Sequence, residues 1–350
     1  MQPTQPIIIS SVVNLDCFVT SSPRSPSSSS EAVNEATALR DKLYEIEKRQ
    51  PLTWFPAREL VVGNFLKEGS IGKVYEAGFR GTMATDNEDE YNLVLKAPKS
   101  TNNQSKLLSE IEAMSILPRS PYIRGLVGVV TFDKKYDSSL NIPFDRLPWV
   151  TCILMERWDM TLQDFITRCK ECLQNFQQPF TQLFLWDVCT IIRQISLGLM
   201  QIRDLRKSHG DLSLRNIMVR SEEREVPSSF GVPCRVRRAR HVAITDFNLM
   251  CNIGMTRKFQ AGQPKCPFHP PEEEVSESVD VFSMGVCIQN MLSVCVDSHG
   301  SQKKEAVKSI LNTAARCMVK TDPYIDMRPS LEECVRMANT GLKYLGGRDA

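Results

Sequence analysis

The chain has 350 residues, with 43 lysines and arginines against 41 aspartates and glutamates, and 42% of its residues are hydrophobic. This is the composition of a globular protein, so disorder of the whole chain is excluded, and the length suffices for two domains or one large bilobal domain. The net charge of +2 is too small to indicate a nucleic-acid-binding or membrane-surface protein.

Membrane and secretory segments are not expected. The best candidate for a membrane span, Val279–Val296, is interrupted by Asp280 and Asn290 and falls short of the roughly 18 uninterrupted apolar residues that a span needs. Residues 6–19 lack the basic start of a secretory signal. The 12 cysteines are scattered along a long chain, which favours free thiols and a cytoplasmic protein.

The first 50 residues divide into a tail and a helix. Residues 1–30 include a serine- and proline-rich run, which buries too little apolar surface to offset its ordering entropy, so a disordered tail is expected. Residues 31–50 carry an apolar stripe at helical spacing, formed by Ala36, Leu39, Leu43 and Ile46. The stripe predicts an amphipathic helix that Pro51 ends. Its apolar face either packs on its own domain or contacts a partner.

The rest of the chain begins with strands and continues with helices. Apolar runs bounded by turn residues predict strands at 60–66, 91–97, 126–132 and 149–155. Helical spacing predicts helices at 107–117, 162–173, 184–205, 279–294, 305–318 and 331–344. The expected fold class is therefore α+β, with a small antiparallel sheet ahead of a larger helical part.

Gly69, Gly72 and Lys96 lie in the strand-rich part. The two glycines fall in a turn between predicted strands, where residues without side chains let backbone N–H groups approach an anion. A hairpin that merely needs glycine explains the same pattern. Lys96 lies in an apolar strand, where a buried ammonium requires a carboxylate or phosphate partner. Glu110 in the following helix can supply that carboxylate, although exposure at a sheet edge would explain an isolated lysine.

Asp211, Asn216 and Asp246 form the strongest signal. They lie beside apolar strand runs, in the segments His209–Asn216 and Val242–Asn248, where an unpaired carboxylate is costly. A hard cation such as Mg²⁺, held by a few carboxylates and by substrate phosphates, explains the three together.

With these motifs the chain resembles a eukaryotic protein kinase over residues 60–344. In that family a glycine-rich loop covers the ATP phosphates, a strand lysine pairs with a helix glutamate, a loop aspartate accepts the substrate proton, and an asparagine and an aspartate hold Mg²⁺. The resemblance implies a bilobal fold, with an N-lobe at about 60–155 and a C-lobe at about 159–344. It implies Lys96, Glu110, Asp211 and Asn216 as catalytic residues and Asn216 and Asp246 as metal ligands. It implies Leu66, Gly69, Gly72, Val74, Lys96, Met155, Glu156 and Trp158 as ATP-binding residues.

Later landmarks agree with the resemblance. Pro270, Pro271 and Glu272 stand where the family has Ala-Pro-Glu, and the run that begins at Asp280 resembles its buried central helix. Arg328 matches the arginine that pairs with that glutamate in the family, so the two are expected to meet.

The chain departs from the family at three single positions and one segment. Lys67 replaces the first loop glycine, Gly210 the arginine of His-Arg-Asp, and Asn248 the glycine of Asp-Phe-Gly. We expect Asn248 to preserve the metal-binding turn because asparagine tolerates positive φ. The interval 294–304 is too short for the family's usual docking helix.

An insertion at 220–240 contains the basic run Arg235–Arg240. It either contacts an acidic partner or forms a solvated hairpin edge.

The expected function is a protein kinase that uses ATP and Mg²⁺ on a protein substrate. Arg215 matches tyrosine kinases or the tyrosine-kinase-like Ser/Thr group, whereas Ser213 replaces the lysine of most Ser/Thr kinases. We favour Ser/Thr specificity because Ser/Thr kinases are more numerous. Two alternatives stay open: a pseudokinase that acts as a binding module, and a small-molecule phosphotransferase.

Overall fold

The computed structural model describes residues 29–69, 71–79, 92–100, 103–133, 149–226, 234–256, 267–294, 302–321 and 325–346. The side chains of 29–36, 173–180, 226, 234, 302 and 303 are not described. The tail expected at 1–30 lies almost wholly outside the described residues. The chain divides into two compact units. Unit 1 comprises Met1–Ile116 and Leu126–Arg157, and unit 2 comprises Leu117–Gly125 and Trp158–Ala350.

Unit 1 differs from the N-lobe expected at about 60–155, because it also includes the chain before residue 60 and Glu156–Arg157 and it leaves out Leu117–Gly125. Leu117–Gly125 belongs to unit 2, although it precedes two strands of unit 1 in the chain. The reason is backbone pairing, because Arg124 donates its N–H to the carbonyl of Ile244 at 2.8 Å and Ile123 forms a β-bridge with the same residue.

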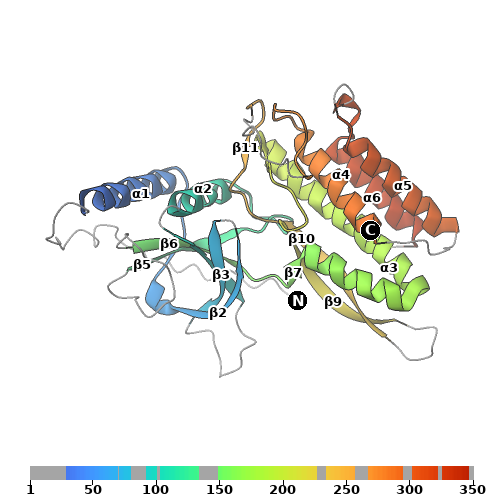
Figure 1. The fold of residues 1–350 in the computed structure, drawn as a ribbon, viewed down its shortest axis with the longest axis horizontal. Coiled ribbons are helices and arrows are strands. Elements are labelled where there is room, and N and C mark those ends of the chain that lie inside the picture. Colours follow the sequence, from blue (N-terminus) through green and yellow to red (C-terminus); the bar gives the residue numbers. More distant parts are fainter. Residues whose placement is uncertain are drawn as a thin grey trace. The chain divides into compact units, whose positions relative to one another are not determined.

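Unit 1 is built on a six-stranded sheet with strand order β1-β5-β6-β4-β3-β2 (Figure 1). Its strands are β1 Trp54–Phe55, β2 Leu60–Glu68, β3 Gly72–Phe79, β4 Leu93–Pro98, β5 Leu126–Asp133 and β6 Trp149–Glu156. Neighbours pair antiparallel, apart from β1 with β5. A short 3-10 helix, Ala57–Glu59, precedes β2. Leu95, Phe132 and Leu154 are fully buried in the core. The predicted antiparallel sheet is confirmed.

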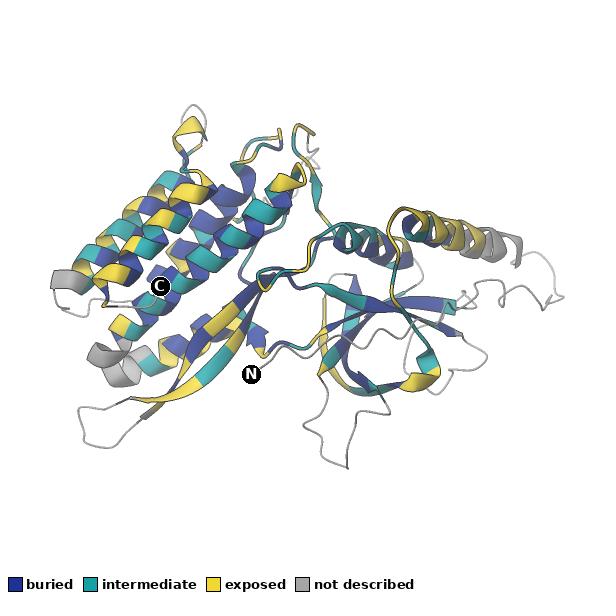
Figure 2. Ribbon diagram, turned by 180° about the vertical axis from the view of Figure 1, so that it is seen from behind, coloured by how far each residue is buried: buried dark blue, intermediate teal, exposed yellow. Residues whose placement is uncertain are grey.

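Two helices complete unit 1: α1 Ser29–Arg49 and α2 Gln104–Ser115. They lie side by side in both ribbon views (Figure 1, Figure 2). The stripe residues Leu39, Leu43 and Ile46 are between 3% and 6% exposed. The Lys42 ammonium of α1 donates to the Ser109 hydroxyl of α2 at 2.7 Å. The apolar face suggested as a partner site is therefore covered within its own unit, because burying it there removes the stripe from water.

The described residues of unit 2 form four long helices: α3 Leu162–Asp204, α4 Val279–Leu292, α5 Gln302–Met318 and α6 Leu331–Tyr344. A 3-10 turn, Ile325–Met327, precedes α6. Buried residues alternate with exposed ones along α5 and α6 (Figure 2). The helices expected at 162–173 and 184–205 are one continuous helix, α3. The interval between α4 and α5 that bears on the missing docking helix lies mostly outside the described residues.

The insertion at 220–240 is an antiparallel hairpin. It consists of β9 Ile217–Val226 and β10 Cys234–Ile244, and β7 Met160–Thr161 pairs with β9. Two shorter strands, β8 Lys207–Ser208 and β11 Cys251–Asn252, form a separate pair. Burial along β9 falls from buried residues at Ile217–Val219 to exposed residues at Glu223–Glu225, whereas β10 mixes buried and exposed residues.

The basic run of the hairpin is not uniformly solvated. Arg235 and Arg237 are exposed and form ion pairs with glutamates of β9. Arg238 is 7% exposed, and its Nε donates to both carboxylate oxygens of Asp187 on α3 at 2.9 Å. The basic run, expected to be solvated or to contact a partner, therefore also attaches the hairpin to α3 through Arg238. Successive side chains of a strand point to opposite faces, and Arg238 lies on the inner face.

Part of α3 is apolar enough to be mistaken for a membrane span. Thr181–Asp204 has a mean hydropathy of 1.4 in its best window, and 61% of that window is buried inside the protein. The stretch weighed from the sequence, Val279–Val296, contains a shorter apolar helix, Val279–Leu292. The buried carboxylate of Asp187 pairs with Arg238, so the composition of this segment suits the core helix of unit 2.

Candidate active site

The turn between β2 and β3 contains the two glycines. The Gly69 N–H donates to the carbonyl of Gly72 at 2.8 Å. A Cβ added at Gly72 would lie 2.7 Å from the carbonyl oxygen of Ala97 on β4, whereas one added at Gly69 meets nothing closer than 3.6 Å. Close packing against β4 therefore explains why residue 72 is glycine. A side chain at position 69 would meet no such obstruction. Near the turn, Leu66 is 42% exposed and Val74 is 8% exposed.

Lys96 and Glu110 meet as the sequence predicts. Lys96 lies in β4 opposite Val74 and Ile153, and Glu110 lies on α2, where it is 1% exposed. The Lys96 ammonium donates to the two carboxylate oxygens at 2.8 and 2.7 Å. The pair joins α2 to β4 of the sheet. Removal of either partner would leave an uncompensated buried charge, which is strongly destabilising.

The residues expected to contact adenine divide between the units. Met155 is 2% exposed in β6, and Glu156 ends that strand with its side chain exposed. Trp158 begins unit 2, where it forms a buried cluster with Met218 and Ala243. The Arg220 guanidinium lies 4.7 Å from the centre of its ring. Its indole nitrogen is buried and has no hydrogen-bond partner among the described residues.

The loop His209–Asn216 is held by its own backbone and by α4. Gly210 has φ of 81°, so the substitution that removes the family's arginine also relieves strain in a left-handed residue. The Asp280 carboxylate accepts the N–H groups of His209 and Gly210 at 2.8 and 3.0 Å. The buried His209 ring accepts the Asp211 N–H at Nδ1 and lies 3.1 Å from the Thr245 carbonyl at Nε2. Nε2 is therefore the donor.

Asp211 and Asn216 are in direct contact. The Asn216 amide donates to the Asp211 carbonyl at 2.8 Å and to its carboxylate Oδ2 at 3.0 Å. Asn216 precedes β9, and its carbonyl accepts the N–H of Thr245 at 2.9 Å. That bond places Asp246 next to this loop, because it directly follows Thr245 in the chain. The three residues singled out from sequence therefore lie at adjoining strand ends in unit 2.

The turn that begins at Asp246 does not have the positive φ at Asn248 that the sequence suggested. The positive φ, 69°, belongs to Asp246, whereas Asn248 is not among the described residues with positive φ. The tolerance of asparagine for that region is therefore not what preserves the turn. Phe247 is 1% exposed and packs edge-on against His209, with ring centres 5.3 Å apart.

Two residues of the segment before α4 pair with residues distant in the chain. His269 places Nε2 at 3.1 Å from Oδ1 of Asp211, a contact that no spacing in the sequence indicated. Glu272 pairs with Arg328, with an Nη2 to Oε2 distance of 3.0 Å. Arg328 also donates from Nε to the Lys320 carbonyl at 2.7 Å. The predicted pairing of Glu272 with Arg328 is confirmed.

The oxygen atoms suit a magnesium ion. The Asn216 amide nitrogen is engaged with Asp211, which leaves its side-chain oxygen as the atom for a cation. With the Asp246 carboxylate this gives two hard oxygen ligands, and Mg²⁺ commonly takes only one or two carboxylates and completes its shell with phosphates and water. Among the described residues no group of three or more His, Cys, Asp or Glu could hold a metal by itself.

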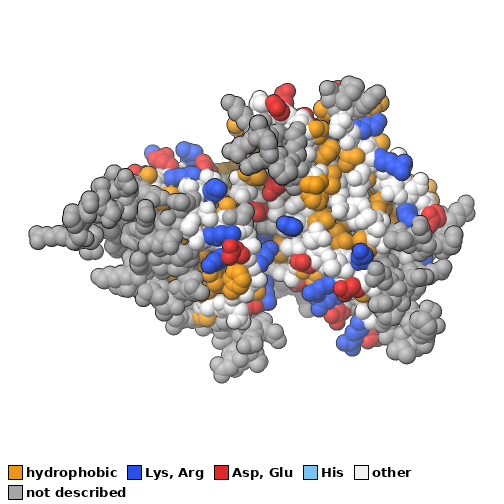
Figure 3. Space-filling view, in the orientation of Figure 1, with side chains coloured by type: hydrophobic (Ala, Val, Ile, Leu, Met, Phe, Trp, Pro, Cys, Tyr) orange, Lys and Arg blue, Asp and Glu red, His pale blue; other side chains and the backbone are white. Residues whose placement is uncertain are grey.

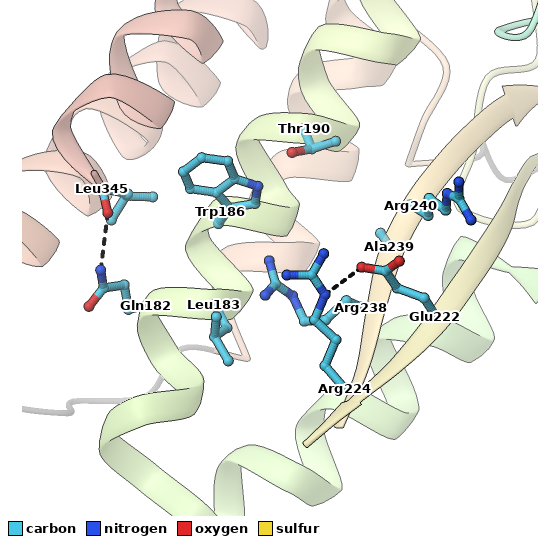
Figure 4. Close-up of a pocket in the computed structure, with 10 residues that line it drawn as sticks. All are labelled: Gln182, Leu183, Trp186, Thr190, Glu222, Arg224, Arg238, Ala239, Arg240 and Leu345. Carbon is cyan, nitrogen blue, oxygen red and sulfur yellow. Dashed lines mark hydrogen bonds and ion pairs between the residues drawn. The ribbon is translucent and has the colours of Figure 1, made fainter. Parts of the chain in front are cut away.

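A separate hollow of about 660 Å³ lies in unit 2 between α3 and the hairpin (Figure 4). Its lining residues are Gln182, Leu183, Trp186, Thr190, Glu222, Arg224, Arg238, Ala239, Arg240 and Leu345. Several of its polar groups are already paired: Gln182 with the Leu345 carbonyl, Arg224 with Glu222, and Arg238 with Asp187. This hollow contains none of the residues singled out for catalysis.

A comparison with protein families agrees with the site. The model described as protein tyrosine and serine/threonine kinase matches residues 60–340. The matched region contains the glycine turn, the Lys96–Glu110 pair, the loop at Asp211 and the Glu272–Arg328 pair.

Proposed function

The chain belongs to the protein tyrosine and serine/threonine kinase family, and we propose on that premise that it transfers the γ-phosphate of ATP to a hydroxyl of a protein substrate. The observation that carries the proposal is the Lys96–Glu110 pair, in which a buried ammonium meets both oxygens of one carboxylate within 2.8 Å. The pair lies on β4, where Lys96 is opposite Val74 on the strand that follows the glycine turn, and a strand lysine at this place holds the α- and β-phosphates of ATP in the family.

Each residue has a role in the proposal. The N–H groups around Gly69 and Gly72 cover the phosphates, Lys96 holds the α- and β-phosphates, and Glu110 holds Lys96. Met155, Glu156 and Trp158 bind the adenine, with Leu66 and Val74 lining the nucleotide. The Asn216 and Asp246 oxygens hold Mg²⁺, which when bound neutralises charge on the phosphates.

The transfer uses Asp211 as the base. One carboxylate oxygen of Asp211 accepts the proton of the substrate hydroxyl, whose oxygen forms a bond to the γ-phosphorus. The bond between that phosphorus and the bridging oxygen breaks, and ADP leaves. Positioning and charge neutralisation supply most of the rate enhancement in this chemistry.

We propose serine or threonine as the acceptor residue, because Ser/Thr kinases are more numerous than tyrosine kinases. Arg215, exposed within the loop His209–Asn216, matches tyrosine kinases or the tyrosine-kinase-like Ser/Thr group and keeps tyrosine as the second candidate. The cytoplasm is proposed as the location, and the free thiols of the described cysteines are compatible with a reducing compartment.

The pseudokinase alternative rests on Lys67 and Asn248. Asn248 does not occupy a left-handed position, so this substitution places no side chain in a conformation that requires glycine. The small-molecule phosphotransferase is disfavoured, because the family match and the Glu272–Arg328 pair belong to protein kinases.

The proposal is tested with the purified full chain, Mg²⁺ and radiolabelled ATP on generic protein substrates, with analysis of the phosphorylated amino acid. The parent is expected to label serine or threonine. Asp211→Asn is expected to bind nucleotide and transfer none, while Asp204→Asn, a change at an exposed aspartate, retains the parent rate. Nucleotide binding without transfer by the parent would support the pseudokinase. An aminoglycoside is included as a small-molecule acceptor, and transfer to it alone would support the small-molecule phosphotransferase.

A further inference from the structure

Asp211 has hydrogen-bond partners on both carboxylate oxygens. Asn216 donates to Oδ2 at 3.0 Å, and Nε2 of His269 lies 3.1 Å from Oδ1. The side chains of Asp211 and His269 are 27% and 20% exposed, so the contact is partly shielded from water. A carboxylate only accepts hydrogen bonds, so the imidazole carries its proton on Nε2.

The segment that carries His269 is anchored on both sides of it. The carbonyl of Phe268 accepts the hydroxyl of Ser283, on α4, at 2.7 Å. Three residues beyond His269, Glu272 is held by Arg328. The imidazole is therefore presented to Asp211 from a fixed stretch of backbone.

This geometry matters because the last torsion of aspartate is soft. Rotation about the bond to the carboxylate is broad and roughly two-fold, so one donor at Oδ2 leaves the plane of the group poorly defined. A second donor at Oδ1, from a different segment, fixes that plane. A base acts only from a defined position, and a displacement of about 1 Å in such groups costs about a hundredfold in rate.

We propose that His269 is a positioning residue that orients the Asp211 carboxylate for the substrate hydroxyl. The inference rests on the proposed function and assigns to it a residue that the family motif does not contain. His269 touches the base and need not touch the substrate. Its effect therefore belongs to turnover and not to nucleotide binding.

The test compares His269→Ala with His269→Gln, which keeps an N–H donor on a side chain of similar reach. His269→Ala is expected to lower kcat by ten- to a hundredfold with KM for ATP within about twofold, in line with misplacement of a base. His269→Gln is expected to recover kcat to within a few fold of the parent. His241→Ala, at an exposed histidine of β10, is the matched control and retains the parent rate.

Three kinetic results would overturn the inference: an unchanged kcat in His269→Ala, a raised kcat that would make His269 a block, or a His269→Gln variant as slow as the alanine. The contact itself is measured without activity, by ¹⁵N spectra of the histidine rings. The His269 signals, assigned from His269→Gln, are expected to move in Asp211→Ala, and unmoved signals would also overturn it. A parent that transfers no phosphate overturns the proposed function, whereas an active parent with an equally active His269→Ala overturns only the role of His269.

Discussion

Two buried ion pairs, Lys96–Glu110 in unit 1 and Arg238–Asp187 in unit 2, are alike in burial and distance. Their shortest contacts are 2.7 and 2.9 Å, and the carboxylate side chain of each is 1% exposed. They differ in their surroundings. Lys96 pairs across the sheet with the strand of the glycine turn, whereas Arg238 joins the hairpin to α3 and lies among residues that are already paired. Burial and pairing alone therefore do not mark a functional site.

Lys96→Met is the variant expected to distinguish the two pairs most clearly. It removes the cation proposed to hold the ATP phosphates and is expected to lower phosphate transfer, per folded molecule, by at least about a hundredfold. Lys106→Met, at an exposed residue of α2, is the control and is expected to keep the parent rate. Single-turnover assays corrected for the folded fraction give the measurement. Equal rates in Lys96→Met and Lys106→Met would show that Lys96, like Arg238, has only a structural role.

Arg328→Ala extends the comparison to a third pair. The change leaves Glu272 without its cation and the Lys320 carbonyl without its donor. Loss of a partner from a buried pair costs about 3 to 5 kcal/mol, so a large fall in unfolding free energy is expected in denaturant titrations. Arg336→Ala, which removes a side chain that is 75% exposed, is expected to change it by less than about 1 kcal/mol. Equal stability of Arg328→Ala and the parent would contradict a buried pair.

Arg238→Met tests the structural pair through pH. Burial raises the pKa of Asp187 to about 6, with Arg238 opposing the rise. A raised pKa in the folded state means that stability falls as pH rises from the ordinary value of aspartate toward the folded one. Without Arg238 the folded pKa rises further, so the loss relative to the parent is expected to be about 3 to 5 kcal/mol at pH 8.

At pH 5 the same variant is expected to lose less, because Asp187 then binds a proton and the buried charge disappears. Denaturant titrations at the two pH values give both numbers. Transfer per folded molecule is expected to match the parent. A loss that is the same at pH 5 and pH 8 would show that Asp187 does not carry the effect.

Arg237→Gln gives the smallest expected effect. The Arg237–Glu223 pair joins β10 to β9, next to Arg238 in the chain, but its side chains are 43% and 52% exposed. Solvent screening limits such pairs to about 0 to 1 kcal/mol, so unfolding free energy is expected to change little. A loss of about 3 kcal/mol would mean that position along the hairpin, rather than burial, sets the strength of these pairs.

Local patterns along the chain predicted much of the fold. The boundaries expected for α6 agree with the structure because Ser330 and Glu333 form a capping box at its start. Pairing of Lys96 with Glu110, 14 positions apart, followed from the cost of a buried ammonium. The sequence did not reveal that α3 is continuous between 173 and 184. The apolar helical spacing weakens there, and such a gap does not show whether the helix ends or continues.

The sequence by itself determined the fold class, the main strands of the first sheet and most helices, because these depend on short-range periodicity and on the chemistry of single side chains. The residues proposed for catalysis followed from the resemblance of its motifs to protein kinases. Tertiary structure alone decided the contacts of His269 with Asp211, of Asp280 with the loop backbone, and of Arg238 with Asp187. Those partners are 58, 70 and 51 positions apart. Contacts at such distances arise from the packing of whole elements, which fixes where a polar group finds the partner that its burial requires.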